Sequence, residues 1–139
     1  MQQCRRLAHR VLLVLTATLV LSCSGVIREW QAATAAQAYY EQLAQGNAVR
    51  FLEGKAGVEQ LPADYCEQLL KAVEQYHEDM QEKHGGLSHV RISDNTLLLA
   101  DTAKVQPVVK AFLILCYSDS TQEEIVVPMV EAGGEWRMK

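Results

Sequence analysis

Hydrophobic residues follow two different spacings along this chain, and the spacing changes near Leu87. Before that point they recur every three or four positions, which predicts helices. We expect a first helix over Glu29 to Gln45, with its apolar stripe at Trp30, Ala33, Ala36, Tyr40, Leu43 and Ala44. A short amphipathic turn at 48–52 comes next. The second long helix is expected to begin near Pro62 and stop at Gly85, with one buried face at Tyr65, Leu69, Val73, Tyr76 and Met80.

After Leu87 the period falls to two, which predicts strands. His89 to Ile92 and Thr96 to Ala100 are expected as pieces of one strand, interrupted at residues 93–95. The strongest strand is Lys104 to Tyr117, and because both of its faces become apolar we expect it to be central. Turns are expected at Asp119-Ser120 and at Ala132-Gly133-Gly134. Each turn reverses the chain and leads into a further strand, first Glu123 to Glu131 and then Glu135 to Lys139. Segregated helices and antiparallel strands predict the α+β class.

The first 22 residues fit neither pattern. Three arginines, Arg5, Arg6 and Arg10, precede the apolar or small residues Val11 to Leu21. That segment is much shorter than the roughly 20 residues needed to cross a bilayer as a helix, and it matches a secretory signal. The four residues Val20-Leu21-Ser22-Cys23 resemble the bacterial lipobox, which is cut before a cysteine that carries diacylglycerol.

The chain is therefore expected to comprise a cleaved lipoprotein signal peptide (1–22), a tether (23–28) lipidated at Cys23, and one domain (29–139). Two other interpretations remain open: an ordinary secretory signal cut near Ser24-Gly25, and an uncleaved anchor. Lipidation at Cys23 predicts a place in the bacterial cell envelope, on the periplasmic or the exposed surface, with the membrane as a partner through the N-terminal lipid.

Charge narrows the range of partners. Without the three arginines of the leader, 10 basic and 17 acidic side chains remain, a net charge of −7. An acidic body is a poor ligand for polyanions, so we expect no binding to nucleic acid and no adsorption to anionic headgroups. Attachment to the membrane must then come from the lipid, and several acyl chains anchor far more stably than one.

Several short segments resemble a known family. They are Tyr39-Tyr40 to Leu43 with Gly46-Asn47, Ala103-Lys104-Val105, Val127-Pro128-Met129-Val130 and Gly134-Glu135-Trp136-Arg137. Together with the order of elements they are similar to small bacterial lipoproteins of unknown function with the cone-shaped fold of nuclear transport factor 2 (NTF2). This resemblance implies N-terminal helices packed on a curved antiparallel sheet. Relatives use the cone as an isomerase or dehydratase pocket, or as a binding or dimerisation surface, so the fold by itself selects none of these.

The residues contain no motif of a catalytic or metal site, and we expect no cofactor and no metal. His77 and His84 lie among acidic residues, which is typical of a solvated helix face, and His89 is expected at a strand edge. The inward stripes predict an apolar interior, with polar groups only at the rim of a pocket. The candidates for that rim are Tyr39, Tyr117 and Asp119.

We therefore expect an envelope lipoprotein that acts as a non-enzymatic binding or assembly module for an envelope protein or a small apolar ligand. An isomerase or lyase with a cone pocket is one alternative, and a structural subunit that forms homodimers is another. Cys66 and Cys116 are expected to stay unpaired. The long helix and long strand should run parallel, which puts the two thiols at opposite ends, whereas a disulfide needs Cα atoms within about 7 Å.

Overall fold

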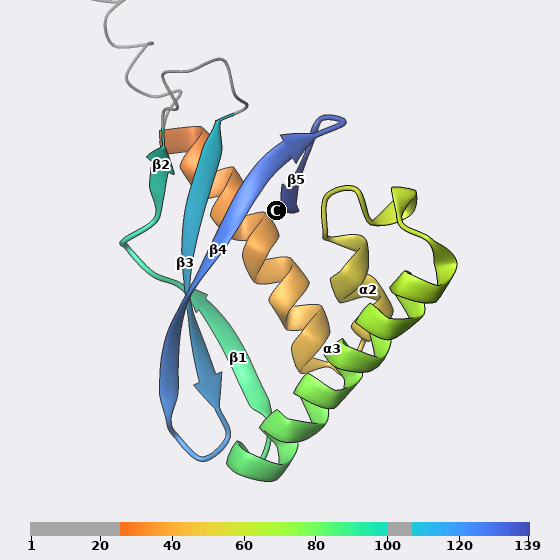
Figure 1. Cartoon of the computed structure of the whole chain (residues 1–139). Coiled ribbons are helices and arrows are strands. Elements are labelled where there is room, and N and C mark those ends of the chain that lie inside the picture. Colours follow the sequence, from red (N-terminus) through yellow and green to blue (C-terminus); the bar gives the residue numbers. More distant parts are fainter. Residues whose placement is uncertain (1–25, 100–106) are drawn as a thin grey trace, which may run out of the picture.

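The computed structural model describes residues 26–99 and 107–139, and of residues 97–99 the backbone alone (Figure 1). These residues belong to the predicted domain and to the end of its tether. The predicted leader, the lipidation residue Cys23 and the start of the predicted long strand (104–106) lie outside the described residues.

The helices come first, as the spacing predicts. They are an N-terminal helix described over residues 26–44, α2 (Ala48–Glu53), the short 3-10 helix η1 (Val58–Gln60) and α3 (Ala63–His84). The N-terminal helix ends at Gly46, which has a φ of 76°, and α3 ends at Gly85, with a φ of 72°. Glycine adopts this left-handed conformation without the cost that a Cβ brings, so both helices stop there. The Asn47 side chain caps α2 by accepting a hydrogen bond from the Arg50 N–H.

The strands form one antiparallel sheet. They are β1 (Leu87–Ile92), β2 (Leu97–Leu99), β3 (Val108–Tyr117), β4 (Gln122–Ala132) and β5 (Glu135–Met138). Their order is β1-β3-β4-β5, with β2 also paired to β3. Ile92 lies opposite Leu113 and Leu97 opposite Lys110, so β1 and β2 succeed each other along one edge of β3. The interrupted strand and the central long strand are both confirmed.

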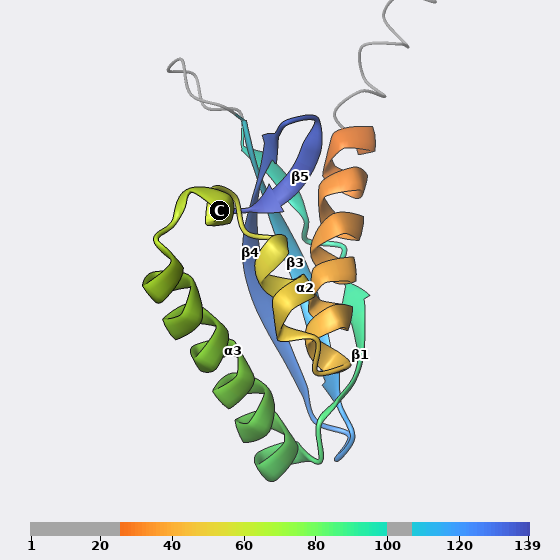
Figure 2. The same ribbon diagram turned by 90° about the vertical axis from the view of Figure 1, so that its right-hand side faces the viewer.

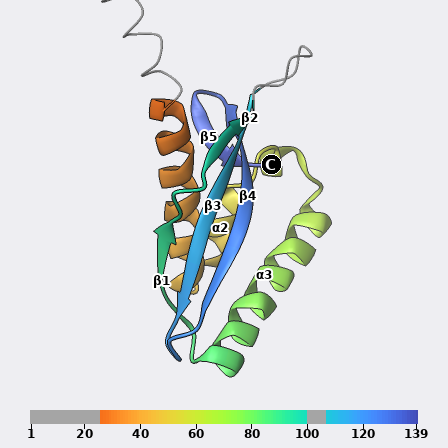
Figure 3. The same ribbon diagram turned by 90° about the vertical axis from the view of Figure 1, so that its left-hand side faces the viewer.

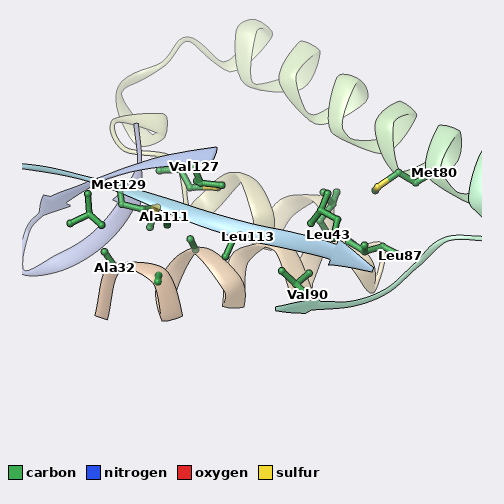
Figure 4. Packing of buried hydrophobic residues seen from close by; sticks show 14 of the residues in the cluster. Ala32, Leu43, Met80, Leu87, Val90, Ala111, Leu113, Val127 and Met129 are labelled. Carbon is green, nitrogen blue, oxygen red and sulfur yellow. The ribbon is translucent and has the colours of Figure 1, made fainter. Parts of the chain in front are cut away.

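The core lies between the N-terminal helix and one face of the sheet (Figure 2). Ala32, Ala33 and Ala36 are buried on the helix, and because alanine has no side chain beyond Cβ, the helix can lie close to the strands. The facing positions of β3 and β4 are fully or almost fully buried: Val109, Ala111, Leu113, Leu115, Val127 and Met129. Figure 4 shows Leu43, Val90 and Leu113 meeting in this layer.

The opposite face of the sheet is not covered by any helix of the described residues (Figure 3). The cross-strand register puts three half-buried side chains of β3 on it, Val108, Phe112 and Ile114. On β4 the exposed Val126 and Pro128 lie opposite Phe112 and Lys110. The centre of this outer face is therefore apolar.

The predicted buried face of α3 is largely wrong. Met80 is its one buried residue, whereas Tyr65 is 48% and Tyr76 42% exposed. Figures 2 and 3 show that α3 meets the sheet at its C-terminal end and diverges from β4 toward its N-terminal end. Both ends are held from outside the helix. The Gly86 carbonyl accepts from the Ser118 N–H (2.9 Å), and the segment before α3 is tied to β5 by the Ala56 N–H, which donates to the Met138 carbonyl (2.7 Å).

Candidate binding site at the free edge of β4

One side of β4 is paired along only part of its length. β5 pairs with Met129 to Ala132, and the Pro128 carbonyl accepts from the Lys139 N–H (2.8 Å) on the same side. In an antiparallel ladder the N–H and C=O of one residue point to the same side, and successive residues alternate. The missing N–H of Pro128 therefore lies on the side away from β3, and so do the main-chain groups of Glu124 and Val126. No other described strand pairs with these two residues.

A hollow of about 190 Å³ runs beside this edge. Tyr40, Phe51 and Leu52 line it from the helices, Val126, Val127, Pro128 and Met138 from the strands, and Lys55 and Lys139 at its border. The rings of Tyr40 and Phe51 meet edge to face, with centroids 5.1 Å apart. The groove is thus mainly apolar, is open to solvent, and offers unpaired main-chain groups along one wall. We call it the β4 groove.

Three tyrosines and a carboxylate form a polar cluster beside it. Tyr117 is 7% exposed, and its hydroxyl donates to the Glu123 carboxylate (2.9 Å). Tyr76 of α3 shares a hydrogen bond with Tyr117, and Tyr40 of the N-terminal helix is close enough to feel the charge of Glu123. Glu123 lies opposite Leu115 in the sheet register, so its side chain is on the inner face.

The pKa values of all three tyrosines in this cluster are raised. Burial is the main cause in each case. For Tyr40, the neighbouring Tyr76 and Glu123 add to the effect of burial, and its pKa rises to about 12. The pKa of Tyr117 is raised by burial and by its hydrogen bond to Glu123, and that of Tyr76 by burial and the charge of Glu123. A group that stays protonated near pH 7 donates hydrogen bonds but cannot act as a general base there.

A second polar group joins the end of α3 to the β3–β4 turn. His84 Nδ1 lies 2.7 Å from Asp119 Oδ2 and 3.2 Å from the Thr121 hydroxyl, which donates to Asp119 Oδ1 (2.6 Å). The imidazole stacks on the Tyr117 ring, with centroids 4.3 Å apart. The hydrogen bonds from the Thr121 side chain and backbone, then that from His84, lower the pKa of Asp119 to about 2. His84 does not line the β4 groove. Its contacts join the C-terminal end of α3 to the turn between β3 and β4.

The structure separates the three predicted rim residues. Tyr117 and Asp119 come together around His84. Tyr39 lies elsewhere: its hydroxyl donates to the Trp136 carbonyl (3.1 Å), and it lines another hollow, of about 390 Å³, with Arg50, Glu53, Glu135 and Arg137. Tyr39, Tyr117 and Asp119 therefore do not form one shared rim. The role of each residue in binding stays a prediction.

The prediction of a solvated face for His77 and His84 is wrong. His84 contacts both Asp119 and the Tyr117 ring, and His77 is half-buried, with its Nε2 3.2 Å from where a Cβ of Gly46 would lie. The Nδ1 of His77 is buried without a hydrogen-bond partner. His89 is exposed on the edge strand β1, as expected.

Sequence reasoning missed Tyr40 and Tyr76 as functional candidates, because their spacing assigned both to apolar stripes. The available signal was the hydroxyl group itself, since a buried phenol needs a hydrogen-bond partner. Glu123 lies 47 residues after Tyr76 in the sequence, and spacing gave no sign that it would be close to Tyr40 and Tyr76.

Neither a metal site nor a membrane-spanning helix is found in the part of the chain that the structure describes. Residues 26–99 and 107–139 contain no cluster of three or more His, Cys, Asp and Glu side chains that could hold a metal ion. Over the same ranges, no helix is long and apolar enough to span a bilayer.

Comparison with known proteins supports the fold. No family model and no curated protein matches the chain. Among solved structures, the chain is similar to the crystal structure of a Campylobacter jejuni protein described as a "putative NTF2-like transpeptidase". The two are 13% identical in sequence, with a TM-score of 0.51 over 74% of this chain and 92% of the other. At this identity the likeness concerns the fold and brings no activity with it. Helices packed on one face of a curved antiparallel sheet, and this structural match, show that the described domain has the NTF2-like cone fold.

Proposed function

We propose that this protein is a lipid-anchored, non-enzymatic binding module of a bacterial envelope, and that it takes up an extended segment of a partner protein in the β4 groove. The single observation that carries the proposal is the unpaired side of β4 beside an apolar groove. An extended peptide that adds to a sheet edge gains main-chain hydrogen bonds, and neighbouring pockets select its side chains.

The surroundings of the groove define the partner's chemistry. Tyr40, Phe51 and Met138 favour an apolar side chain on the segment. The carboxylates of Glu123 and Glu124 are held within the domain, by Tyr117 and by Ser93 with Asn95, so the groove selects its segment by apolar contact and main-chain pairing. The exposed Tyr65 and Tyr76 on α3 add apolar surface of the kind that marks interaction sites.

The edge is also protected against indiscriminate pairing. Pro128 removes one donor from it, a device that natural sheets use at their edges. A partner must therefore match both the interrupted edge and the groove, which favours a specific segment over a second copy of β4.

The enzyme alternative finds less support. Catalysis by acid and base needs a titratable group within reach of a substrate. The raised pKa values of the tyrosines in the polar cluster disfavour a role as base near neutral pH, and His84 with Asp119 joins α3 to the sheet at an open surface. In the dimer alternative, two copies of the chain would meet through the outer face around Phe112 and Val126. The mass of a crosslinked adduct distinguishes a second copy of the chain from a different partner protein.

The test is site-specific photocrosslinking in cells that make the protein. A benzoylphenylalanine at position 65 replaces an exposed aromatic residue on the α3 face that carries Tyr76, and a matched probe at position 78 lies on the other face of the same helix. We expect a defined adduct with another protein from position 65 and none from position 78. Val126→Pro should weaken the adduct, because it removes the edge N–H, whereas Val126→Ala keeps that N–H and should retain the adduct.

Two outcomes would count against the groove. An adduct that forms equally from position 78, or that ignores Val126→Pro, would place the contact elsewhere. An adduct of twice the chain's mass would show that a second copy is the partner and support the dimerising subunit.

The anchor has its own test. Mass spectrometry of protein extracted from membranes should find an acylated N-terminal Cys23, and Cys23→Ala should release the domain from the membrane. A mature chain that begins at Ser24 or later, without acylation, would contradict the anchor and leave the β4 groove untouched.

A further inference from the structure

Three large apolar side chains are exposed together in the first described turns of the N-terminal helix. Val26 is 66%, Ile27 53% and Trp30 63% exposed. Positions 26 and 30 are one helical turn apart and 27 is adjacent, so the three share one side of the helix. The expectation that Trp30 belongs to the buried stripe is therefore wrong. We call these three residues the helix-start patch.

The cationic neighbour of the patch, Arg28, is occupied by contacts within the domain. The Arg28 guanidinium pairs with Glu131 (3.0 Å) and lies over the Trp136 ring, 5.9 Å from its centroid. Beside the patch, Val26, Trp30 and Ile92 line a hollow of about 180 Å³. Its other lining includes the polar residues Glu29, Ser93, Asp94 and Thr96. The described start of the helix thus presents apolar surface, while the Arg28 side chain is held against the sheet.

The position of the patch along the chain limits what can cover it. Val26 comes three residues after Cys23, and three residues of fully extended chain span at most about 11 Å. A diacylated cysteine sits at the boundary of headgroups and acyl chains. Amphipathic helices rest with their apolar face about 5–10 Å into that same zone, and tryptophan is enriched there.

We propose that the helix-start patch inserts into the interfacial layer of the bilayer that holds Cys23, so that the domain docks on the membrane in one orientation. This inference rests on the lipid anchor of the proposed function. The N-terminal helix then points away from the membrane, and its 19 described residues span about 28 Å. Figure 1 shows β2 at the same end as the helix start, and the β3–β4 turn at the opposite end.

The chemistry of the surface is apolar rather than electrostatic. The net charge of −7 after loss of the leader disfavours an anionic membrane, so docking should persist on zwitterionic lipid and in high salt. The patch without the lipid is too small for stable attachment, which is why the two signals act together.

The test uses full-length lipidated protein, purified from membranes and reconstituted into phosphatidylcholine vesicles with brominated acyl chains. Bromine quenches nearby tryptophan, and the chain contains two tryptophans, Trp30 and Trp136. The difference between wild-type protein and Trp30→Phe isolates the Trp30 signal without altering Trp136. We expect that difference signal to be quenched and shifted to shorter wavelength.

A matched control places the only new tryptophan away from the patch. Trp30→Phe combined with Val49→Trp puts it on α2 at a position that is 54% exposed. We expect no quenching there. Val26→Ser with Ile27→Ser should reduce the quenching of Trp30, and because both side chains are exposed, the melting curve should stay unchanged.

The outcomes separate the docking from the anchor. Protein that floats with the vesicles while Trp30 emission stays unquenched would overturn the docking and leave the anchor standing. Equal quenching at position 49 would also overturn it, because the domain would then lack a fixed orientation. Protein that fails to float would contradict the anchor itself.

Discussion

His84 Nδ1 lies 2.7 Å from Asp119 Oδ2, and this contact joins the last turn of α3 to the turn between β3 and β4. The pKa of Asp119 is lowered from 3.8 to about 2, chiefly by Thr121 and then by His84. A carboxylate with a lowered pKa in the folded state stabilises the fold above its unfolded pKa. That contribution is lost as the pH falls toward the folded pKa.

We therefore expect the free energy of unfolding to fall between about pH 4 and pH 2 in the wild-type protein, and to fall less steeply in Asp119→Asn. Denaturant titrations across that range measure it. Thr121→Val should flatten the profile in the same way, because it removes the strongest cause of the lowered pKa. Equal acid profiles in all three proteins would show that the contact contributes nothing to folding.

Two neighbouring residues of β4 should respond very differently to proline. The Val126 N–H faces the free edge, whereas the Ile125 N–H faces Leu113 in β3. Ile125→Pro should cost about 1–3 kcal/mol through the unsatisfied carbonyl of Leu113 alone. Val126→Pro should cost less than Ile125→Pro. Urea denaturation compares them, with Ile125→Ala as the control for the lost side chain, and similar costs would mean that the edge is paired.

The two ends of α3 should differ in their effect on stability. Met80 is 3% exposed and Tyr65 48%. Met80→Ala should cost about 2–5 kcal/mol, because it empties a packed site, and Tyr65→Ser should change the free energy of unfolding by no more than about 0.5 kcal/mol. A large loss in Tyr65→Ser would indicate that the N-terminal half of α3 packs on the domain in solution.

Gly54 is required by its contact with Tyr39. A Cβ at position 54 would overlap the ring of Tyr39 at Cδ1, although the backbone φ of −73° accepts alanine. Gly54→Ala should therefore cost about 1–3 kcal/mol by overpacking. In the background Tyr39→Ala the same change should cost much less, and the double-mutant cycle measures this coupling. An additive cycle would place the effect of Gly54 elsewhere.

The two cysteines of the domain are free, which confirms the sequence prediction. Cys66 is partly exposed and Cys116 is 4% exposed. Under native conditions Cys66 should react with Ellman's reagent well before Cys116, because only an accessible thiolate attacks the reagent. Unfolding without reductant should expose both thiols, and the absence of free thiol there would indicate a disulfide.

The periodicity of the sequence was sufficient for the elements and for much of the topology. Glycine and proline mark where helices begin or end, and alternation gives β3 two apolar faces, which predicts its central place in the sheet. The parallel course of α3 and β3, which keeps Cys66 away from Cys116, results from counting reversals of direction. These features are local or depend only on the order of elements, so one sequence suffices to predict them.

The site depended on distances between elements, which periodicity does not encode. Spacing shows that Tyr65 and Tyr76 share a face of α3. It does not show that α3 diverges from β4, which depends on the hydrogen bonds that hold the segments before and after the helix. Likewise Asp119 reaches His84 across 35 positions, and Glu123 reaches Tyr117 through the sheet register. Hydrophobic spacing determines which face of an element is apolar. Only the tertiary structure decides what covers that face, because the cover comes from residues distant in the chain.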